Sequence, residues 1–194
     1  QGITGRHPLP DVATCVERFS AWGVGPETQV VVYDDAGGAI ASRLWWLLHW
    51  LGHETAALLD GGWQHWVDEG RACGQGTETF RPRFFKAQPS KNWVCNTDEI
   101  QERMKSRETL LLDVRNPSRY LGEKELIDPV AGHIPGALNE PFQANLDSEG
   151  YWKSPEKLRK HYLQRFPSLP EKQVVSYCGS GVTACHTFFA LRYA

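Results

Sequence analysis

Short apolar runs alternate with longer segments of mixed polarity along this chain. The short runs are rich in valine or leucine and predict strands at residues 30–33, 56–59, 110–114 and 173–177. The longer segments predict helices at residues 40–51, 63–69, 99–105, 155–165 and 182–193. Strands that alternate with helices are typical of α/β domains with largely parallel sheets.

Local signals set the expected boundaries of these elements. Thr97 is an expected helix N-cap. Ser154 followed by Pro155 predicts another helix start, because proline suits the first helical position. Residues 71–92 are rich in Gly, Pro, Arg and Gln and have no lasting periodicity. We therefore expect a linker there.

Cys178 carries the candidate chemistry. It ends an apolar run and precedes Gly179, Ser180 and Gly181, after which a helix-compatible stretch begins. A strand, a glycine-rich turn and a helix start direct several backbone N–H groups at one point. A thiol placed there has its pKa lowered from ~8.5 towards roughly 3.5–7.5, and the thiolate is the nucleophilic form. The sequence therefore predicts covalent sulfur chemistry at Cys178.

The two halves of the chain repeat one pattern. Residues 31–38 and 175–181 each pass from an apolar run into a glycine-containing turn, and a helix with an adjacent aromatic pair follows each turn. A period this long indicates duplicated domains rather than a solenoid array. Asp34 stands in the first copy where Cys178 stands in the second. Since a carboxylate cannot carry a sulfane sulfur, the first half is expected to be inert and the second active.

Composition narrows the class of protein. The 194 residues suffice for one large domain or two small ones, and 41% hydrophobic with 23% charged residues is typical of a soluble globular protein. A net charge of −2 gives no field that would recruit nucleic acid or an anionic membrane. No apolar run approaches the ~20 residues of a membrane span. Five cysteines without CxxC or zinc-ligand spacing favour free thiols in a reducing, cytoplasmic compartment, with no metal or organic cofactor.

Three motifs carry a resemblance that covers essentially the whole chain. Residues 178–183 read Cys-Gly-Ser-Gly-Val-Thr, residues 132–137 read Gly-His-Ile-Pro-Gly-Ala, and residues 59–63 read Leu-Asp-Gly-Gly-Trp. The first is similar to the catalytic loop of mercaptopyruvate-type enzymes, the second to an early-domain signature and the third to the end of a first domain. Together they resemble the tandem-domain rhodanese-family sulfurtransferases, and most of all the 3-mercaptopyruvate sulfurtransferases.

The resemblance implies a fold and a domain division. We expect two rhodanese-like α/β domains with parallel sheets flanked by helices: a non-catalytic one over residues 1–70 and a catalytic one over residues 93–194, joined by the linker 71–92. Both would be truncated. The first lacks its opening strand and its own Gly-His-Ile-Pro-Gly-Ala segment, and the second stops before its final strand. By this comparison the intact protein is expected to be longer.

The resemblance also implies a two-step transfer. The Cys178 thiolate would take a sulfane sulfur from a small-molecule donor, and pyruvate or sulfite would leave. An acceptor, which would be cyanide, a small thiol or a thioredoxin-like protein, would then remove the sulfur from the persulfide. The loop residues expected to surround that persulfide are Gly179, Gly181, Val182 and Thr183.

Further site residues follow from the resemblance alone. Mercaptopyruvate sulfurtransferases use a Ser–His–Asp relay, in which Ser180 and His7 match the serine and the histidine. The aspartate would lie before Gln1. Arg119 matches an arginine that binds the donor carboxylate. A second arginine is expected near residues 126–128, where this chain has Leu-Ile-Asp, and Arg6 is a candidate to contribute instead.

The donor and the activity stay open at this point. The rhodanese-type loop has two cations where this chain has Gly179 and Ser180, so a neutral loop favours monoanionic mercaptopyruvate over dianionic thiosulfate. Thiosulfate:cyanide sulfur transfer and a non-turnover sulfur carrier or interaction module are the alternatives. A Cys-x5-Arg phosphatase is disfavoured, because the required arginine position holds Ala184. We expect Asp113 and Arg115 to orient the loop or pair internally, His133 to be a structural hydrogen-bonder and Cys185 to be packed.

Overall fold

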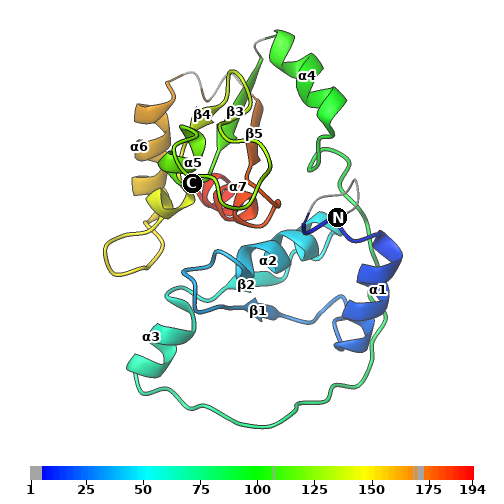
Figure 1. Cartoon of the computed structure of the whole chain (residues 1–194). Coiled ribbons are helices and arrows are strands. Elements are labelled where there is room, and N and C mark those ends of the chain that lie inside the picture. Colours follow the sequence, from blue (N-terminus) through cyan, green and yellow to red (C-terminus); the bar gives the residue numbers. More distant parts are fainter. Residues whose placement is uncertain (1–5, 107, 168, 170–172) are drawn as a thin grey trace. The chain divides into compact units, whose positions relative to one another are not determined.

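The computed structural model describes residues 6–106, 108–167, 169 and 173–194 (Figure 1). The chain forms two compact units. The first unit is Pro8–Trp93, and the second unit is Val94–Ala194 together with Arg6 and His7. Each contains parallel strands and helices, which confirms the predicted α/β class.

The first unit contains α1 (Val12–Ala21), β1 (Val30–Val32), α2 (Ala41–Trp50), β2 (Ala56–Leu58) and α3 (Gly62–Asp68). β1 and β2 pair in parallel, with Val30 opposite Ala56. Trp45, Trp46 and Leu48 of α2 are buried, so the aromatic pair of this helix belongs to the core as its sequence suggests. The hydrophobic pattern did not predict α1. Asp11 is the N-cap of this helix, and its side chain accepts a hydrogen bond from the Thr14 amide.

The expected linker has no helix or strand among residues 71–92, yet its second part packs against the first unit. The Arg83 amide donates to the Ser20 carbonyl at 3.0 Å, and the Gln88 amide donates to the Leu51 carbonyl at 2.8 Å. Phe85 is buried, with its ring centroid 5.1 Å from that of Phe19. Burial of one large aromatic side chain stabilises a segment that has no periodic pattern.

Asp34 follows β1 and satisfies the turn that leads into α2. Its carboxylate accepts four backbone hydrogen bonds of 2.7–2.9 Å, from the amides of Ala36, Gly38, Ile40 and Ala41. Burial of the carboxyl group opposes its ionisation, but these four donors prevail and lower its pKa. The first unit therefore builds an amide-lined loop whose anion is part of the protein itself.

Replacing Asp34 with asparagine is expected to destabilise the first unit by about 1–3 kcal/mol, because four backbone amides lose a charged acceptor. The sign of the pH dependence follows from the lowered pKa. The stabilisation of the folded state by the Asp34 carboxylate is fully present above pH 3.8, the ordinary pKa of aspartate. It is lost as the pH falls through the lower folded-state pKa. Urea unfolding at pH 7 and at pH 3 measures the difference. The matched change Asp35→Asn, at an exposed neighbour, is expected to alter stability by less than about 0.5 kcal/mol; equal effects of the two variants would contradict this role.

The second unit has a central parallel sheet. Its elements are α4 (Thr97–Ser106), β3 (Thr109–Asp113), α5 (Pro117–Tyr120), β4 (Leu138–Asn139), the 3-10 helix η1 (Phe142–Asn145), α6 (Pro155–Arg165), β5 (Gln173–Tyr177) and α7 (Thr183–Tyr193). The strand order is β4-β3-β5, and Asp113 at the end of β3 is opposite Tyr177 at the end of β5. The loops that follow β3 and β5 therefore start side by side at one edge of the sheet.

The core of the second unit explains why β3 is central. Every residue of β3 is buried, as a strand between two parallel neighbours should be. Its apolar side chains cluster with residues of α6 and α7, and the buried set comprises Leu110, Leu112, Val114, Leu158, Tyr162, Phe166, Ala184 and Ala190. This packing fixes the start of α7, and with it the loop that carries Cys178.

One predicted helix cap is wrong and another is confirmed. Thr97 is the first residue of α4 rather than its cap. Asn96 and Glu99 form a reciprocal capping box: the Asn96 side chain accepts from the Glu99 amide at 2.9 Å, and the Glu99 carboxylate accepts from the Asn96 amide at 2.8 Å. Ser154 does cap α6, with Pro155 at the first helical position. The elements α5, β4 and η1 escaped prediction because two to four residues show no period.

Candidate active site

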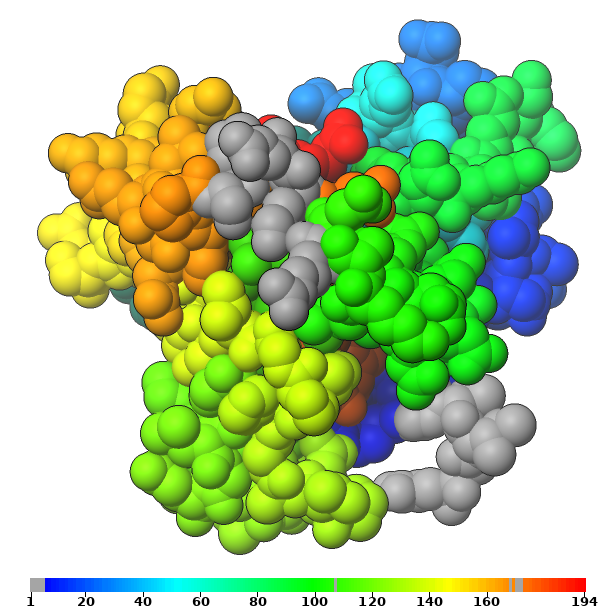
Figure 2. All heavy atoms as spheres, turned by 90° about the horizontal axis from the view of Figure 1, so that it is seen from above, coloured from blue at the N-terminus to red at the C-terminus, as the bar shows by residue number. Residues whose placement is uncertain are grey.

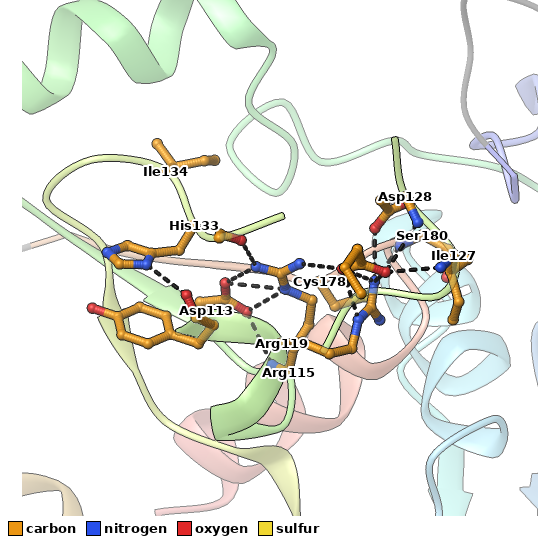
Figure 3. Close-up of polar contacts among 12 residues, drawn as sticks. Asp113, Arg115, Arg119, Ile127, Asp128, His133, Ile134, Cys178 and Ser180 are labelled. Carbon is orange, nitrogen blue, oxygen red and sulfur yellow. Dashed lines mark hydrogen bonds and ion pairs between the residues drawn. The ribbon is translucent and has the colours of Figure 1, made fainter. Parts of the chain in front are cut away.

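The Cys178 side chain lies in a loop of backbone amides between β5 and α7 (Figure 3). Its Sγ accepts hydrogen bonds from the Gly181 amide at 3.1 Å and from the Ser180 amide at 3.5 Å. Gly181 has a φ of 73°, a left-handed conformation that favours glycine. The turn thus folds the chain back towards the sulfur.

The surroundings of Cys178 favour its thiolate. Burial of the sulfur opposes ionisation. The Thr183 hydroxyl and the amides of Ser180, Ala184 and Gly181 prevail, and they lower the pKa of the thiol below its ordinary value. The physical setting is therefore that of a nucleophilic cysteine.

A buried ion pair lies at the neighbouring strand end. Arg115 donates from Nε to Asp113 at 2.9 Å and from Nη2 to Asp113 at 2.6 Å, which confirms the expected internal pairing. Arg115 Nη2 also donates to the Gly132 carbonyl at 2.6 Å. Burial and the Asp113 carboxylate raise the pKa of Tyr177, so its hydroxyl stays protonated beside that carboxylate. These contacts hold the loop at Gly132 against the end of β3.

The Gly-His-Ile-Pro-Gly-Ala segment has a structural role. Nδ1 of His133 lies 2.7 Å from the Tyr120 carbonyl, and the two rings stack with centroids 3.7 Å apart. The Ile134 amide donates to the Tyr177 hydroxyl at 3.0 Å. His133 is thus a structural hydrogen-bonder, as expected, and it faces away from Cys178 in Figure 3.

A cluster of arginines and carboxylates borders the cysteine loop. Arg119 in α5 binds the Glu125 carboxylate through Nε at 3.0 Å and Nη2 at 2.9 Å, and its Nη2 also contacts Asp128 at 2.7 Å. Arg6 forms an ion pair with the same Asp128. Hydrogen bonds from the Asp128 amide, the Arg119 side chain and the Ile127 amide lower the pKa of Glu125 to about 2 although burial opposes this. Glu125 is therefore ionised at neutral pH.

Gly179 leaves room for this cluster beside Cys178. A Cβ atom at Gly179 would lie 3.4 Å from Arg119 Nη2 and 3.2 Å from the Asp128 carboxylate, and it would also collide with the Arg6 guanidinium. A side chain at the residue after Cys178 would therefore have no room, because two arginines and a carboxylate occupy that space. Figure 3 shows Asp128 and Ser180 close to Cys178.

The structure brings together most of the residues singled out in the sequence. Cys178 and Ser180 share one loop with Gly179, Gly181, Val182 and Thr183, and Arg119 lies against it. His7 is exposed and follows Arg6, and its relay with Ser180 stays a prediction. The relay aspartate, expected before Gln1, lies outside the described residues.

Sequence reasoning missed Glu125 and Asp128 as parts of the site. The signal that could have found them is the charged run Glu-Lys-Glu-Leu-Ile-Asp at residues 123–128, close to Arg119.

Cys185 is buried, as expected of a packed thiol. Across the described parts of the chain, no group of three or more His, Cys, Asp and Glu residues is placed to hold a metal ion. Within the same ranges, no helix has the length and hydropathy to cross a bilayer.

The parallel α/β sheet and the thiol in an amide-lined strand–helix turn place the chain in a class of α/β proteins that carry a cysteine at this turn. The family model of the rhodanese-like domain matches residues 4–69 and 96–194, and the chain belongs to this family.

Known relatives agree with the family assignment. The chain is 46% identical over 195 residues to a probable 3-mercaptopyruvate sulfurtransferase of Pseudomonas aeruginosa, covering 100% of this chain and 69% of that protein. It is 35% identical to the thiosulfate sulfurtransferase of Bos taurus, covering 94% of this chain and 63% of that protein. The crystal structure of the 3-mercaptopyruvate sulfotransferase SseA from Escherichia coli matches with a TM-score of 0.81 and 29% identity, covering 95% of this chain and 68% of that one. The chain thus spans roughly two thirds or less of the curated relatives' length.

Proposed function

We propose that this protein is a sulfurtransferase that moves a sulfane sulfur from 3-mercaptopyruvate to a thiol or cyanide through a persulfide on Cys178. The observation that supports this proposal is the Cys178 sulfur in its amide-lined loop, with a lowered pKa. In the first step the thiolate attacks the donor sulfur. The donor's carbon–sulfur bond breaks, and pyruvate leaves as its enolate and takes up a proton. In the second step the acceptor attacks the outer sulfur and releases the Cys178 thiolate.

Other residues take supporting roles in this proposal. The amides of Ser180, Gly181 and Ala184 would hold the persulfide anion as they hold the sulfur. Ser180 and His7 would supply the proton for the leaving enolate, and Arg119 would bind the donor carboxylate.

The first half would carry no sulfur-accepting nucleophile of its own. Residues 1–70 would form a non-catalytic domain of a tandem pair, because Asp34 fills its loop with a carboxylate, and residues 71–92 would link it to the catalytic domain at 93–194. A cytoplasmic location and a thioredoxin-like acceptor also belong to this proposal.

Thiosulfate is the second candidate donor, since a relative named thiosulfate sulfurtransferase is 35% identical. Loop charge distinguishes the two donors. Gly179 and Ser180 add no cation next to Cys178, and the nearby arginines are matched by Glu125 and Asp128. A neutral surrounding favours the monoanionic donor over the dianion.

Kinetics with both donors and cyanide as acceptor test the proposed function. We expect kcat/KM for 3-mercaptopyruvate to exceed that for thiosulfate by about tenfold or more, and Ser180→Lys to shift this ratio towards thiosulfate by about tenfold. Ser148→Lys adds the same charge at an exposed turn, and it should leave the ratio unchanged. Preference for thiosulfate by the wild type would reverse the donor assignment. Persulfide formation without release to any acceptor would instead favour the carrier module.

A further inference from the structure

Asp128 lies between two arginines beside the nucleophile. Its carboxylate contacts Arg119 Nη2 at 2.7 Å through one oxygen and pairs with Arg6 through the other. Both guanidinium groups border the space next to Gly179, the residue that follows Cys178. The protein thus places one of its own carboxylates where a carboxylate-bearing donor would have to bind.

Arg119 does not need Asp128 as its ionic partner. Glu125 already takes the Nε and Nη2 edge of this arginine, with a side chain that is only 4% exposed and is held by the amides of Ile127 and Asp128. Two hydrogen bonds of this kind satisfy a guanidinium edge. Asp128 is therefore a second, surplus carboxylate at the same arginine.

Asp128 is also placed so that it can be displaced. Its side chain is 26% exposed, and within the described residues the hydrogen bonds to its carboxylate come from Arg6 and Arg119. Residues 121–136 have no helix or strand, and their yellow-green atoms lie at the surface in Figure 2. A partly exposed ion pair on such a loop exchanges partners at modest free-energy cost.

We propose that Asp128 is an internal carboxylate ligand of the Arg6–Arg119 pair, and that the carboxylate of an anionic sulfur donor displaces it on binding. Arg6 is then the second arginine of the donor site, in place of the one that residues 126–128 do not supply. The identity of the donor rests on the proposed function. The occupied arginine pair does not, because its geometry belongs to the resting protein.

Asp128 then lowers the affinity for every carboxylate ligand that competes with it. Asp128→Asn is expected to lower the KM for 3-mercaptopyruvate by about tenfold with kcat nearly unchanged, because the lost competitor affects ground state and transition state alike. Arg6→Gln is expected to raise the same KM by about tenfold.

Alkylation of Cys178 tests the arginine pair without any turnover. Iodoacetate and iodoacetamide both react by displacement of iodide, with a new carbon–sulfur bond formed as the carbon–iodine bond breaks, but only iodoacetate carries a carboxylate. The ratio of the two rates at Cys178, followed by mass spectrometry of its peptide, separates carboxylate binding from thiol reactivity. We expect Asp128→Asn to raise the ratio about tenfold and to lose this gain when Arg119→Gln is added.

The control removes one charge from the same loop. Glu123→Gln changes an exposed carboxylate, and it should leave the ratio at the wild-type value. Asp128→Ser removes the same carboxylate and replaces Asp128→Asn if circular dichroism shows that the asparagine variant is unfolded. A ratio in both Asp128 variants that equals the wild-type ratio would overturn the inference. A raised ratio without 3-mercaptopyruvate turnover by the wild type would leave the occupied pair standing and reject the proposed function.

Discussion

Replacing Cys178 with serine is expected to reduce sulfur transfer from either donor by about 10⁴-fold or more, the scale seen when a covalent nucleophile is removed. A serine hydroxyl stays protonated in the same ring of amides and cannot hold a second sulfur atom as a persulfide. The substitution changes one atom in a loop whose amides are fixed by β5 and α7, so the fold should be retained. Cyanide-acceptor assays with each donor provide the measurement.

Mass spectrometry sharpens the test of Cys178. Wild-type protein incubated with donor and no acceptor should gain one sulfur atom on the peptide that contains Cys178, and the serine variant should gain none. Cys73→Ser alters an exposed thiol and should keep wild-type rates. If Cys178→Ser retained more than about one hundredth of the wild-type activity, another residue would have to carry the sulfur.

Replacing Arg115 with methionine is expected to destabilise the second unit by about 3–5 kcal/mol, because the Asp113 carboxylate would remain buried without its partner. Asp113 is fully buried and Arg115 nearly so, and the pair also holds the Gly132 carbonyl. A methionine fills much of the volume of the arginine stem. The loss in free energy of unfolding therefore measures the effect of removing the charge. The midpoint of urea unfolding measures it.

Two comparisons separate the ion pair from surface charge. Arg159→Met removes an exposed arginine of α6, and it should change stability by no more than about 0.5 kcal/mol. Adding Asp113→Leu to Arg115→Met removes both buried charges, and it should recover part of the lost stability. A loss below about 1 kcal/mol for Arg115→Met alone would show that water or another group satisfies Asp113.

Local patterns in the sequence were enough to predict the class of fold and the amide-lined turn at Cys178. A strand, a turn and a helix start are each encoded by neighbouring residues, and their order places amides around Cys178 and around Asp34 alike. Ser154 was correctly predicted as the cap of α6 because this signal too lies in adjacent residues, Ser154 and Pro155. The cap of α4 did not, since Asn96 and Thr97 are both good capping residues and only the reciprocal bonds with Glu99 distinguish them.

The charges around the nucleophile depended on the tertiary structure. Arg6 and Asp128 are 122 residues apart in the sequence. Asp128, on the segment that follows β3, reaches Gly179 because parallel pairing sets the ends of β3 and β5 at one edge of the sheet, and Arg6 joins them from the N-terminal segment. The sequence by itself determined the amide-lined setting of the proposed nucleophile, because that setting is made by adjacent residues. Only the tertiary structure decided which charged groups surround that atom, because an ion pair depends on distance in space and not on separation along the chain.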